Sequence, residues 1–275
     1  MTCAEPLTLL YRGPLASCNY GCAYCPFDTR GSPPDELAAD RDALERFVDW
    51  VGAAGRPLRL LFTPRGEALV HPWYQEALRR LSHLRHLERA TIQTNLSAPL
   101  GWLDGAEPSR LGIWATYHPA RSSRERFLES CAALERCGVF YSVGVVGLRE
   151  HLREIEALRA ALPPRVYVWV NAYKHEPGYY RPDELTRIEA VDPQFPVELE
   201  PGSSLGQPCR TGCSALSVNG AGDASRCFFV DDPLGNLYRG DLALDPAPSR
   251  CPAPTCRCYI GYVFREGLPL ARSRF

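Results

Sequence analysis

The sequence lacks the long apolar runs of membrane proteins. No stretch of its 275 residues approaches the ~20 consecutive apolar residues that cross a bilayer. The first residues, 1–6, also lack a basic region followed by an apolar stretch, so we expect no signal peptide. Both absences predict a cytoplasmic protein that is not attached to a membrane.

An excess of charge of either sign is also missing. The formal net charge is −1 and the pI is about 6.6. Such a balance creates no overall field that would attract nucleic acid or an anionic membrane, and we expect neither as a partner. Lysine is almost absent, since Lys174 is the only lysine among 31 basic residues. We interpret this preference for arginine as coding bias.

Cysteine, by contrast, is abundant, with 12 in the chain. Thiols stay reduced in the cytoplasm, so these residues indicate metal binding rather than disulfides. They are unevenly placed: three lie within residues 18–25 and six between residues 209 and 258. The sequence therefore predicts two separate metal-binding regions.

The first region has the pattern CxxxCxxC, formed by Cys18, Cys22 and Cys25, with Tyr24 directly before the third cysteine. Three thiolates in one short loop can bind three irons of a [4Fe–4S] cluster and leave the fourth iron open to a small molecule. A zinc site would favour paired CxxC elements with a fourth ligand nearby, and the haem pattern CxxCH is absent. The spacing and the aromatic residue resemble the signature of the radical S-adenosylmethionine (SAM) enzymes.

The resemblance implies a function. In that family the open iron binds the amino and carboxylate groups of SAM, and an electron from the cluster releases a 5′-deoxyadenosyl radical. We therefore expect an enzyme that abstracts hydrogen from a small-molecule or peptide substrate, with an electron donor such as flavodoxin or ferredoxin as its partner. Tyr24 would lie against the adenine. Arg65-Gly66-Glu67 resembles the Gly-Gly-Glu motif of the family, in which Gly66 and Glu67 would hold the amino group of SAM.

Strand-like and helix-like segments alternate up to about residue 190. Six β/α units in series predict a parallel sheet with helical crossovers, and eight would close a full barrel. The resemblance implies an α/β fold of the incomplete (β/α)6 TIM-like barrel type. The pattern alone leaves an open Rossmann-type sheet as an alternative, although the cysteine loop stands where that fold would have a glycine-rich turn.

Polar residues at the ends of the predicted strands complete the candidate site, because ligands in such barrels lie at the C-terminal ends of the strands. Gln93 and Asn95 end the third strand and could reach the ribose or carboxylate of SAM. Thr116, His118 and Asn171 are candidates for catalysis. Three further residues are candidates for substrate contact by position alone: Lys174, His175 and Glu176.

The second cysteine-rich region follows a stretch rich in Pro, Gly and Ser, which predicts a linker over 195–208. The linker would separate a partial barrel at 1–194 from a small domain at 209–275 that contains a hairpin. Its cysteines resemble those of the twitch and SPASM extensions of radical SAM enzymes, which hold auxiliary iron–sulfur clusters. We expect a second [4Fe–4S] cluster, and a structural zinc site with four cysteines is the alternative. The candidate ligands are Cys209, Cys213, Cys227, Cys251, Cys256 and Cys258.

Two other classes of protein stay open. One is an activating enzyme for a glycyl-radical enzyme, whose partner would be a protein. The other is a non-catalytic module that binds zinc or an iron–sulfur cluster, in which the strand-end polar residues would be incidental.

Overall fold

The computed structural model of the protein describes residues 6–27 and 31–268. One sheet of nine strands forms its centre, in the order β10-β9-β8-β1-β2-β3-β4-β5-β6. The strands are β1 (Leu7–Arg12), β2 (Leu58–Phe62), β3 (Leu87–Thr94), β4 (Leu111–Tyr117), β5 (Phe140–Val146), β6 (Val168–Asn171), β8 (Ala215–Asn219), β9 (Asp223–Cys227) and β10 (Val230–Asn236). A separate pair of short strands consists of β7 (Pro208–Cys209) and β11 (Ser249–Arg250).

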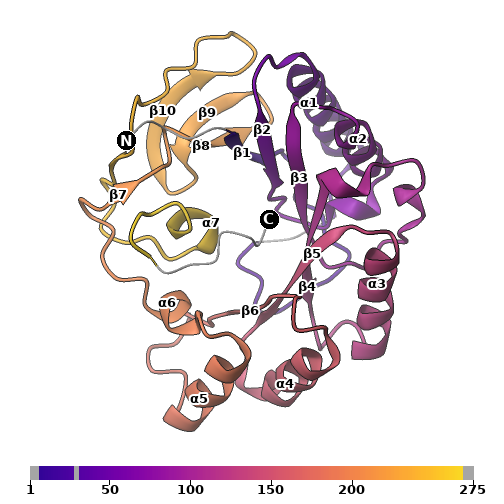
Figure 1. Ribbon diagram of the computed structural model, residues 1–275, viewed down its shortest axis with the longest axis vertical. Coiled ribbons are helices and arrows are strands. Elements are labelled where there is room, and N and C mark those ends of the chain that lie inside the picture. Colours follow the sequence, from indigo (N-terminus) through magenta and orange to yellow (C-terminus); the bar gives the residue numbers. More distant parts are fainter. Residues whose placement is uncertain (1–5, 28–30, 269–275) are drawn as a thin grey trace.

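Seven α-helices accompany the strands: α1 (Pro34–Ala53), α2 (Pro72–Ser82), α3 (Arg124–Arg136), α4 (Leu152–Ala161), α5 (Pro182–Val191), α6 (Phe195–Leu199) and α7 (Tyr259–Tyr262), all within the described residues. Short 3₁₀ turns occur at Ala68–Val70, Gly101–Leu103, Pro108–Arg110 and Arg149–His151. In Figure 1 the strands follow an arc, with α1 to α4 along its outer side and α7 inside it.

The strands β1 to β6 lie side by side in chain order and pair in parallel. β1 illustrates the burial typical of parallel strands. Its run Leu7-Thr8-Leu9-Leu10-Tyr11 is buried throughout, as expected for a strand that is covered on both faces. The mostly parallel sheet with its helices confirms the predicted α/β class. In the part of the chain that the structure describes, the edge strands β6 and β10 do not pair with each other, so closure into a barrel is not seen.

The C-terminal segment continues this sheet. β8 pairs in parallel with β1 on the side away from β2, and β9 and β10 extend the sheet in antiparallel fashion. The hairpin that the sequence predicts is therefore β8–β9. Part of the predicted linker, residues 195–199, forms α6, and Phe195 is fully buried. The domain boundaries remain a prediction, but residues on both sides of the linker share one sheet.

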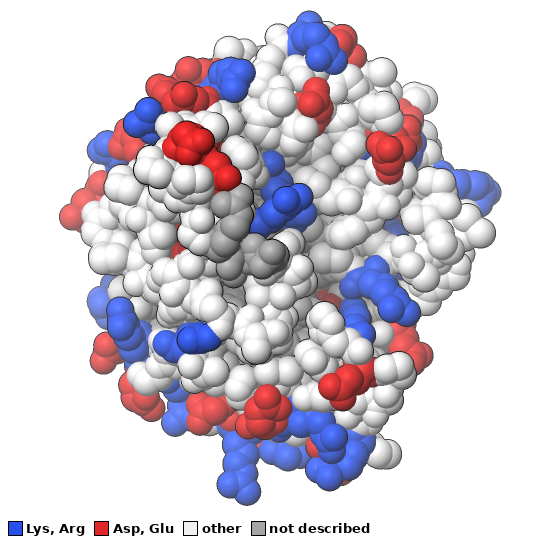
Figure 2. Space-filling model, turned by 180° about the vertical axis from the view of Figure 1, so that it is seen from behind, with Lys and Arg blue, Asp and Glu red and all other residues white. Residues whose placement is uncertain are grey.

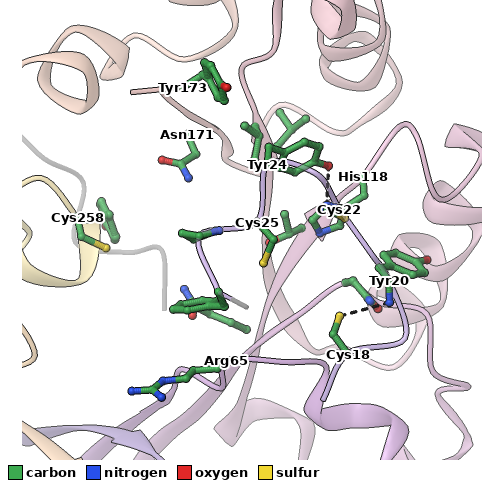
Figure 3. A pocket seen from close by; sticks show the side chains of 18 of the residues that line it. Cys18, Tyr20, Cys22, Tyr24, Cys25, Arg65, His118, Asn171, Tyr173 and Cys258 are labelled. Carbon is green, nitrogen blue, oxygen red and sulfur yellow. Dashed lines mark hydrogen bonds between the residues drawn. The ribbon is translucent and has the colours of Figure 1, made fainter. Parts of the chain in front are cut away.

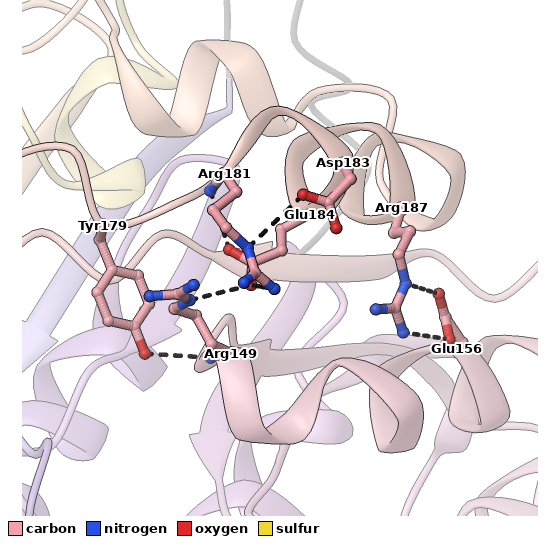
Figure 4. Close-up of polar contacts among 7 residues, drawn as sticks. All are labelled: Arg149, Glu156, Tyr179, Arg181, Asp183, Glu184 and Arg187. Atoms are coloured by element: carbon pink, nitrogen blue, oxygen red, sulfur yellow. Dashed lines mark hydrogen bonds and ion pairs between the residues drawn. The ribbon is translucent and has the colours of Figure 1, made fainter.

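Ion pairs join α4 to α5 (Figure 4). Arg187 binds Glu156 of α4 in bidentate fashion, with N–O distances of 2.6 and 2.9 Å. Nε of Arg149 donates to Glu184 at 3.0 Å, and the other oxygen of that carboxylate accepts from the amide of Arg181 at 2.9 Å, at the start of α5. These contacts hold α5 against α4 and against the turn that carries Arg149.

Charged side chains of both signs alternate around the rim of the face seen in Figure 2, as the net charge of −1 leads one to expect. Basic side chains stand near the centre of that face. Within the described ranges, no helix is both long and apolar enough to cross a membrane.

Candidate active site

A cavity of about 380 Å³ lies at the C-terminal ends of the parallel strands. Its volume is in the range of small-molecule sites, and its position is where parallel α/β folds bind ligands. The loop after β1, the ends of β2 to β6 and the segment before α7 line it. The structure brings together every residue predicted for cofactor binding or catalysis, namely Tyr24, Gly66, Glu67, Gln93, Asn95, Thr116, His118 and Asn171. Their individual roles remain predictions.

The three cysteines of the loop after β1 also line this cavity (Figure 3). Cys18, Cys22 and Cys25 are free thiols and partly exposed. The amide of Tyr20 donates to Sγ of Cys18 at 3.4 Å, and the amide of Cys25 donates to the carbonyl of Cys22 at 3.0 Å. Burial raises the pKa of Cys18 and of Cys25. A bound cation would offset this effect, since thiolates are the form that binds metal.

No three His, Cys, Asp or Glu side chains of the described residues are grouped so that they could hold a single metal ion. The ligands of a cubane cluster do not need such convergence, because each binds a different iron. Three free thiols in one short loop, beside a cavity of this size, fit the [4Fe–4S] cluster that the sequence implies.

Gly66 fixes the position of the cysteine loop. A Cβ at this residue would lie 1.7 Å from the carbonyl oxygen of Ser17, a distance that no side chain tolerates. The same carbonyl accepts a hydrogen bond from the amide of Glu67 at 3.0 Å. Glycine therefore allows the loop after β2 to approach the backbone directly before Cys18.

The carboxylate of Glu67 is buried and joins two loops. Its Oε1 accepts from Oγ1 of Thr94 at 2.7 Å and from the amide of Leu69 at 3.1 Å, and its Oε2 accepts from the amide of Asn95 at 2.5 Å. Burial raises the pKa of Glu67, while these three hydrogen bonds lower it. Both oxygens thus have partners within the chain, so Glu67 holds the end of β3 against the loop after β2. Its predicted contact with SAM stays a prediction.

Asn95 links the end of β3 to the cysteine loop. Its Nδ2 donates to Oδ1 of Asn19 at 2.9 Å, and Nδ2 of Asn19 donates to Oγ of Ser97 at 2.9 Å. Leu96, between these partners, has a φ of +56°, a rare conformation for a residue with a side chain. The contacts place the cysteine loop on β3 from the side opposite Gly66.

His118, at the end of β4, lies against the cysteine loop. Its Nδ1 is 2.8 Å from the hydroxyl of Tyr24 and 3.5 Å from Sγ of Cys22. Burial, followed by the nearby charges of Arg121 and His151, lowers the pKa of His118 to about 4. The imidazole is therefore neutral at neutral pH, and its Nδ1 can accept from the tyrosine hydroxyl, whose own pKa is raised by burial.

The C-terminal cysteines differ in their surroundings. Cys209, Cys227, Cys251 and Cys256 lie near one another: burial, followed by the neighbouring thiols Cys227, Cys209, Cys251 and Cys258, raises the pKa of Cys256 to about 12. The β7–β11 ladder pairs Cys209 with Ser249, close in sequence to Cys251. Gly261 allows this group to pack closely, since a Cβ there would lie 2.8 Å from Sγ of Cys256. Among the described residues, these thiols do not converge on a single metal ion, although a cubane cluster would not require them to, because each thiol would bind a different iron.

The other two cysteines differ from these four. Cys213 is disulfide-bonded, so its sulfur is not available as a thiolate ligand, and the expectation of metal binding rather than a disulfide does not hold for this cysteine. Cys258 is a free thiol that lines the main cavity, across from Cys18 and Tyr20 (Figure 3). The structure therefore does not support Cys213 as a ligand, and it places Cys258 at the cavity as well as near Cys256.

Aromatic side chains place the segment before α7 at the cavity. Tyr259 packs with ring centroids 5.3 Å from Trp114 of β4 and 5.7 Å from Trp169 of β6. This contact brings Arg257 into the lining. Trp169, Arg257 and Tyr259 line the cavity but were missed in the sequence, because no motif marks them and they meet only through contacts far apart in the chain.

No known family profile matches the chain, and no curated protein matches it. Solved structures do. One is histidine-tagged anSMEcpe with bound AdoMet (SAM), an anaerobic sulfatase-maturating radical SAM enzyme. The two structures superpose with a TM-score of 0.55 at 13% sequence identity, and the match covers 86% of this chain and 76% of that chain. Native anSMEcpe with bound AdoMet and the Cp18Cys peptide has a TM-score of 0.52 at 15% identity, over 84% of this chain and 78% of that chain.

At this identity the likeness shows the fold. The chain shares the fold of these AdoMet-bound radical SAM structures, in agreement with the resemblance inferred from its cysteine pattern.

Proposed function

We propose that this protein is a radical SAM enzyme. The observation that carries the proposal is the position of Cys18, Cys22 and Cys25, three free thiols with the CxxxCxxC spacing that line a single cavity at the strand ends. The polar residues of β2 to β6 line the same cavity, which is large enough for a small molecule. The neighbours with bound AdoMet support the proposal through their shared fold.

The three cysteines would hold a [4Fe–4S] cluster, which when bound would supply the electron that cleaves SAM to the 5′-deoxyadenosyl radical. The radical would abstract hydrogen from a small-molecule or peptide substrate, and flavodoxin or ferredoxin would provide the electron. The chain's own part is positional: Gly66, Glu67 and Asn95 hold the cysteine loop, while Trp169 and Tyr259 form an aromatic wall of the cavity.

The test is anaerobic. The protein is reconstituted with iron and sulfide, dithionite and SAM are added, and 5′-deoxyadenosine is quantified. Cys22→Ala is the test variant, and Cys137→Ala, an exposed free cysteine beyond the end of α3, is the matched control. We expect product from the wild type and from Cys137→Ala, and none from Cys22→Ala. A cluster-loaded wild type that neither binds nor cleaves SAM would refute the proposal.

We also propose that Cys209, Cys227, Cys251 and Cys256 hold the auxiliary [4Fe–4S] cluster. With both clusters the reconstituted chain should contain about eight irons, and Cys227→Ala should lose about half of them. Cys137→Ala again serves as control. Stoichiometric zinc in the purified wild type, with only about four irons after reconstitution, would favour the structural zinc site instead.

A further inference from the structure

Lys174 is the only lysine of the chain, and it lines the cavity. Coding bias explains why the other basic residues are arginine, but it does not explain a lysine at this position. The residue lies just after β6 and is half-buried, and its Nζ donates to the carbonyl oxygen of Arg257 at 2.9 Å. An ammonium has further protons to donate after this one bond.

The backbone that carries Lys174 is anchored. The hydroxyl of Tyr180 accepts from the amide of Tyr173 at 2.7 Å and donates to the carbonyl of Gly147 at 2.8 Å. The hydroxyl of Tyr179 accepts from the amide of Arg149 at 3.1 Å. These bonds tie the segment after β6 to the end of β5, so the ammonium of Lys174 is held at the cavity wall.

The cavity has an excess of positive charge. Arg65, Lys174 and Arg257 line it, and none of them forms an ion pair within the part of the chain that the structure describes. Glu67 is the only acidic residue in the lining, and hydrogen bonds already engage both of its oxygens. Burial lowers the pKa of Lys174, and the carboxylate of Glu198, which lies outside the lining and accepts from Nε1 of Trp169 at 2.5 Å, partly offsets this effect. One outer carboxylate thus faces three cations of the lining, so the wall keeps a net positive charge.

The cofactors would not neutralise it either. SAM carries two positive groups, its sulfonium and ammonium, against one carboxylate. The negative charge of a cluster and its thiolates would lie at the cysteine loop, whereas Lys174 binds the carbonyl beside Cys258, across the cavity from Cys18 in Figure 3.

We propose that Lys174 and Arg257 bind an anionic group of the substrate, a carboxylate or a phosphate. The inference rests on the proposed function, because it takes this cavity as the active site. The guanidinium of Arg257 offers a planar fork that matches two oxygens, and the ammonium of Lys174 adds a compact charge from the neighbouring strand end. In a partly dry cavity such charge pairs are stronger than in water.

The test measures anion binding by calorimetry on the reconstituted, SAM-loaded protein, with succinate and inorganic phosphate as probes. The two probes distinguish a carboxylate from a phosphate. We expect the wild type to bind one of them, and Lys174→Gln and Arg257→Gln each to weaken its affinity at least tenfold. Lys174→Arg, which keeps the charge, should lose less than Lys174→Gln. Arg85→Gln, an exposed arginine far from the cavity lining, is the matched control and should bind normally.

Three results would overturn the proposal: no binding of either anion to the wild type, equal affinity in the wild type and Lys174→Gln, or an equal loss in Arg85→Gln. An equal fall in the affinity of Lys174→Gln for SAM, measured by equilibrium dialysis, would also overturn it, because Lys174 would then bind SAM rather than the substrate. Failure of the proposed function looks different. The wild type would form no 5′-deoxyadenosine, yet anion binding would still depend on Lys174.

Discussion

Gly66 and Ser17 touch through their backbones, so that a Cβ on residue 66 would lie 1.7 Å from the carbonyl oxygen of Ser17. The contact joins the loop after β2 to the loop that carries the cysteines. A rigid connection of this kind matters because a cluster needs its three ligands at set positions before it binds.

Gly66→Ala should therefore displace the cysteine loop. We expect a loss of about 3 kcal/mol in the free energy of unfolding, and a fall in iron bound after reconstitution, because the backbone of Ser17 must move. Urea denaturation and iron analysis measure the two effects. Gly52→Ala, at an exposed helical position where a Cβ meets nothing within 4 Å, is the control and should be neutral or slightly stabilising. Equal behaviour of the two variants would contradict the structural role of Gly66.

The side chains of Asn19 and Asn95 should be energetically coupled. Their hydrogen bond, at 2.9 Å, joins the cysteine loop to the end of β3. A double-mutant cycle with Asn19→Ala and Asn95→Ala should give a coupling of about 1 kcal/mol in the free energy of unfolding. Asn219, the last residue of β8, serves as a comparison because no hydrogen bond joins it to Asn95 in the described residues, so the Asn219→Ala and Asn95→Ala cycle should be additive. Additivity in the first cycle as well would show that the bond contributes nothing.

Glu67 should make the stability of the protein depend on pH. Burial raises the pKa of Glu67 above the ordinary value of 4.5, so the folded state keeps the proton at pH values where the unfolded state has released it. The contribution of Glu67 is therefore fully present below 4.5 and is lost as the pH rises through the raised pKa.

The check compares the wild type with Glu67→Gln, which cannot titrate at this position. The difference in free energy of unfolding between them should shrink from about pH 5 to about pH 8 as the wild type loses this contribution. Urea denaturation at both pH values measures it. A difference that stays constant, or that grows in favour of the wild type, would show that the three hydrogen bonds outweigh burial.

Gly261→Ala should damage the auxiliary site and spare the cysteine loop. The added methyl group would lie 2.8 Å from Sγ of Cys256, so this thiol or α7 must shift. We expect about half of the iron to be lost, as in Cys227→Ala. Gly101→Ala, where a Cβ meets nothing within 4 Å, is the control. Full iron content in Gly261→Ala would argue against Cys256 as a ligand.

The sequence by itself determined the features that are local in the chain. The spacing of Cys18, Cys22 and Cys25 lies within eight residues, and each strand end lies next to the strand that positions it. Parallel strands bring their C-terminal ends to one edge, which is why Gln93, Thr116 and Asn171 could be predicted to meet there. The alternation of strands and helices likewise predicted a parallel sheet from local periodicity alone.

The tertiary structure decided what depends on contacts between distant residues. β8 lies beside β1 because a buried strand edge can accept a parallel strand from anywhere later in the chain. The six C-terminal cysteines have no spacing that separates them, so only packing could show that Cys258 lines the cavity. The sequence marked Lys174 as a candidate for substrate contact only by its position after the sixth strand, whereas its contact with Arg257 depends on the packing of distant segments. Short-range spacing in the sequence predicts local geometry, whereas contacts between distant residues follow from the free energy of packing the whole chain.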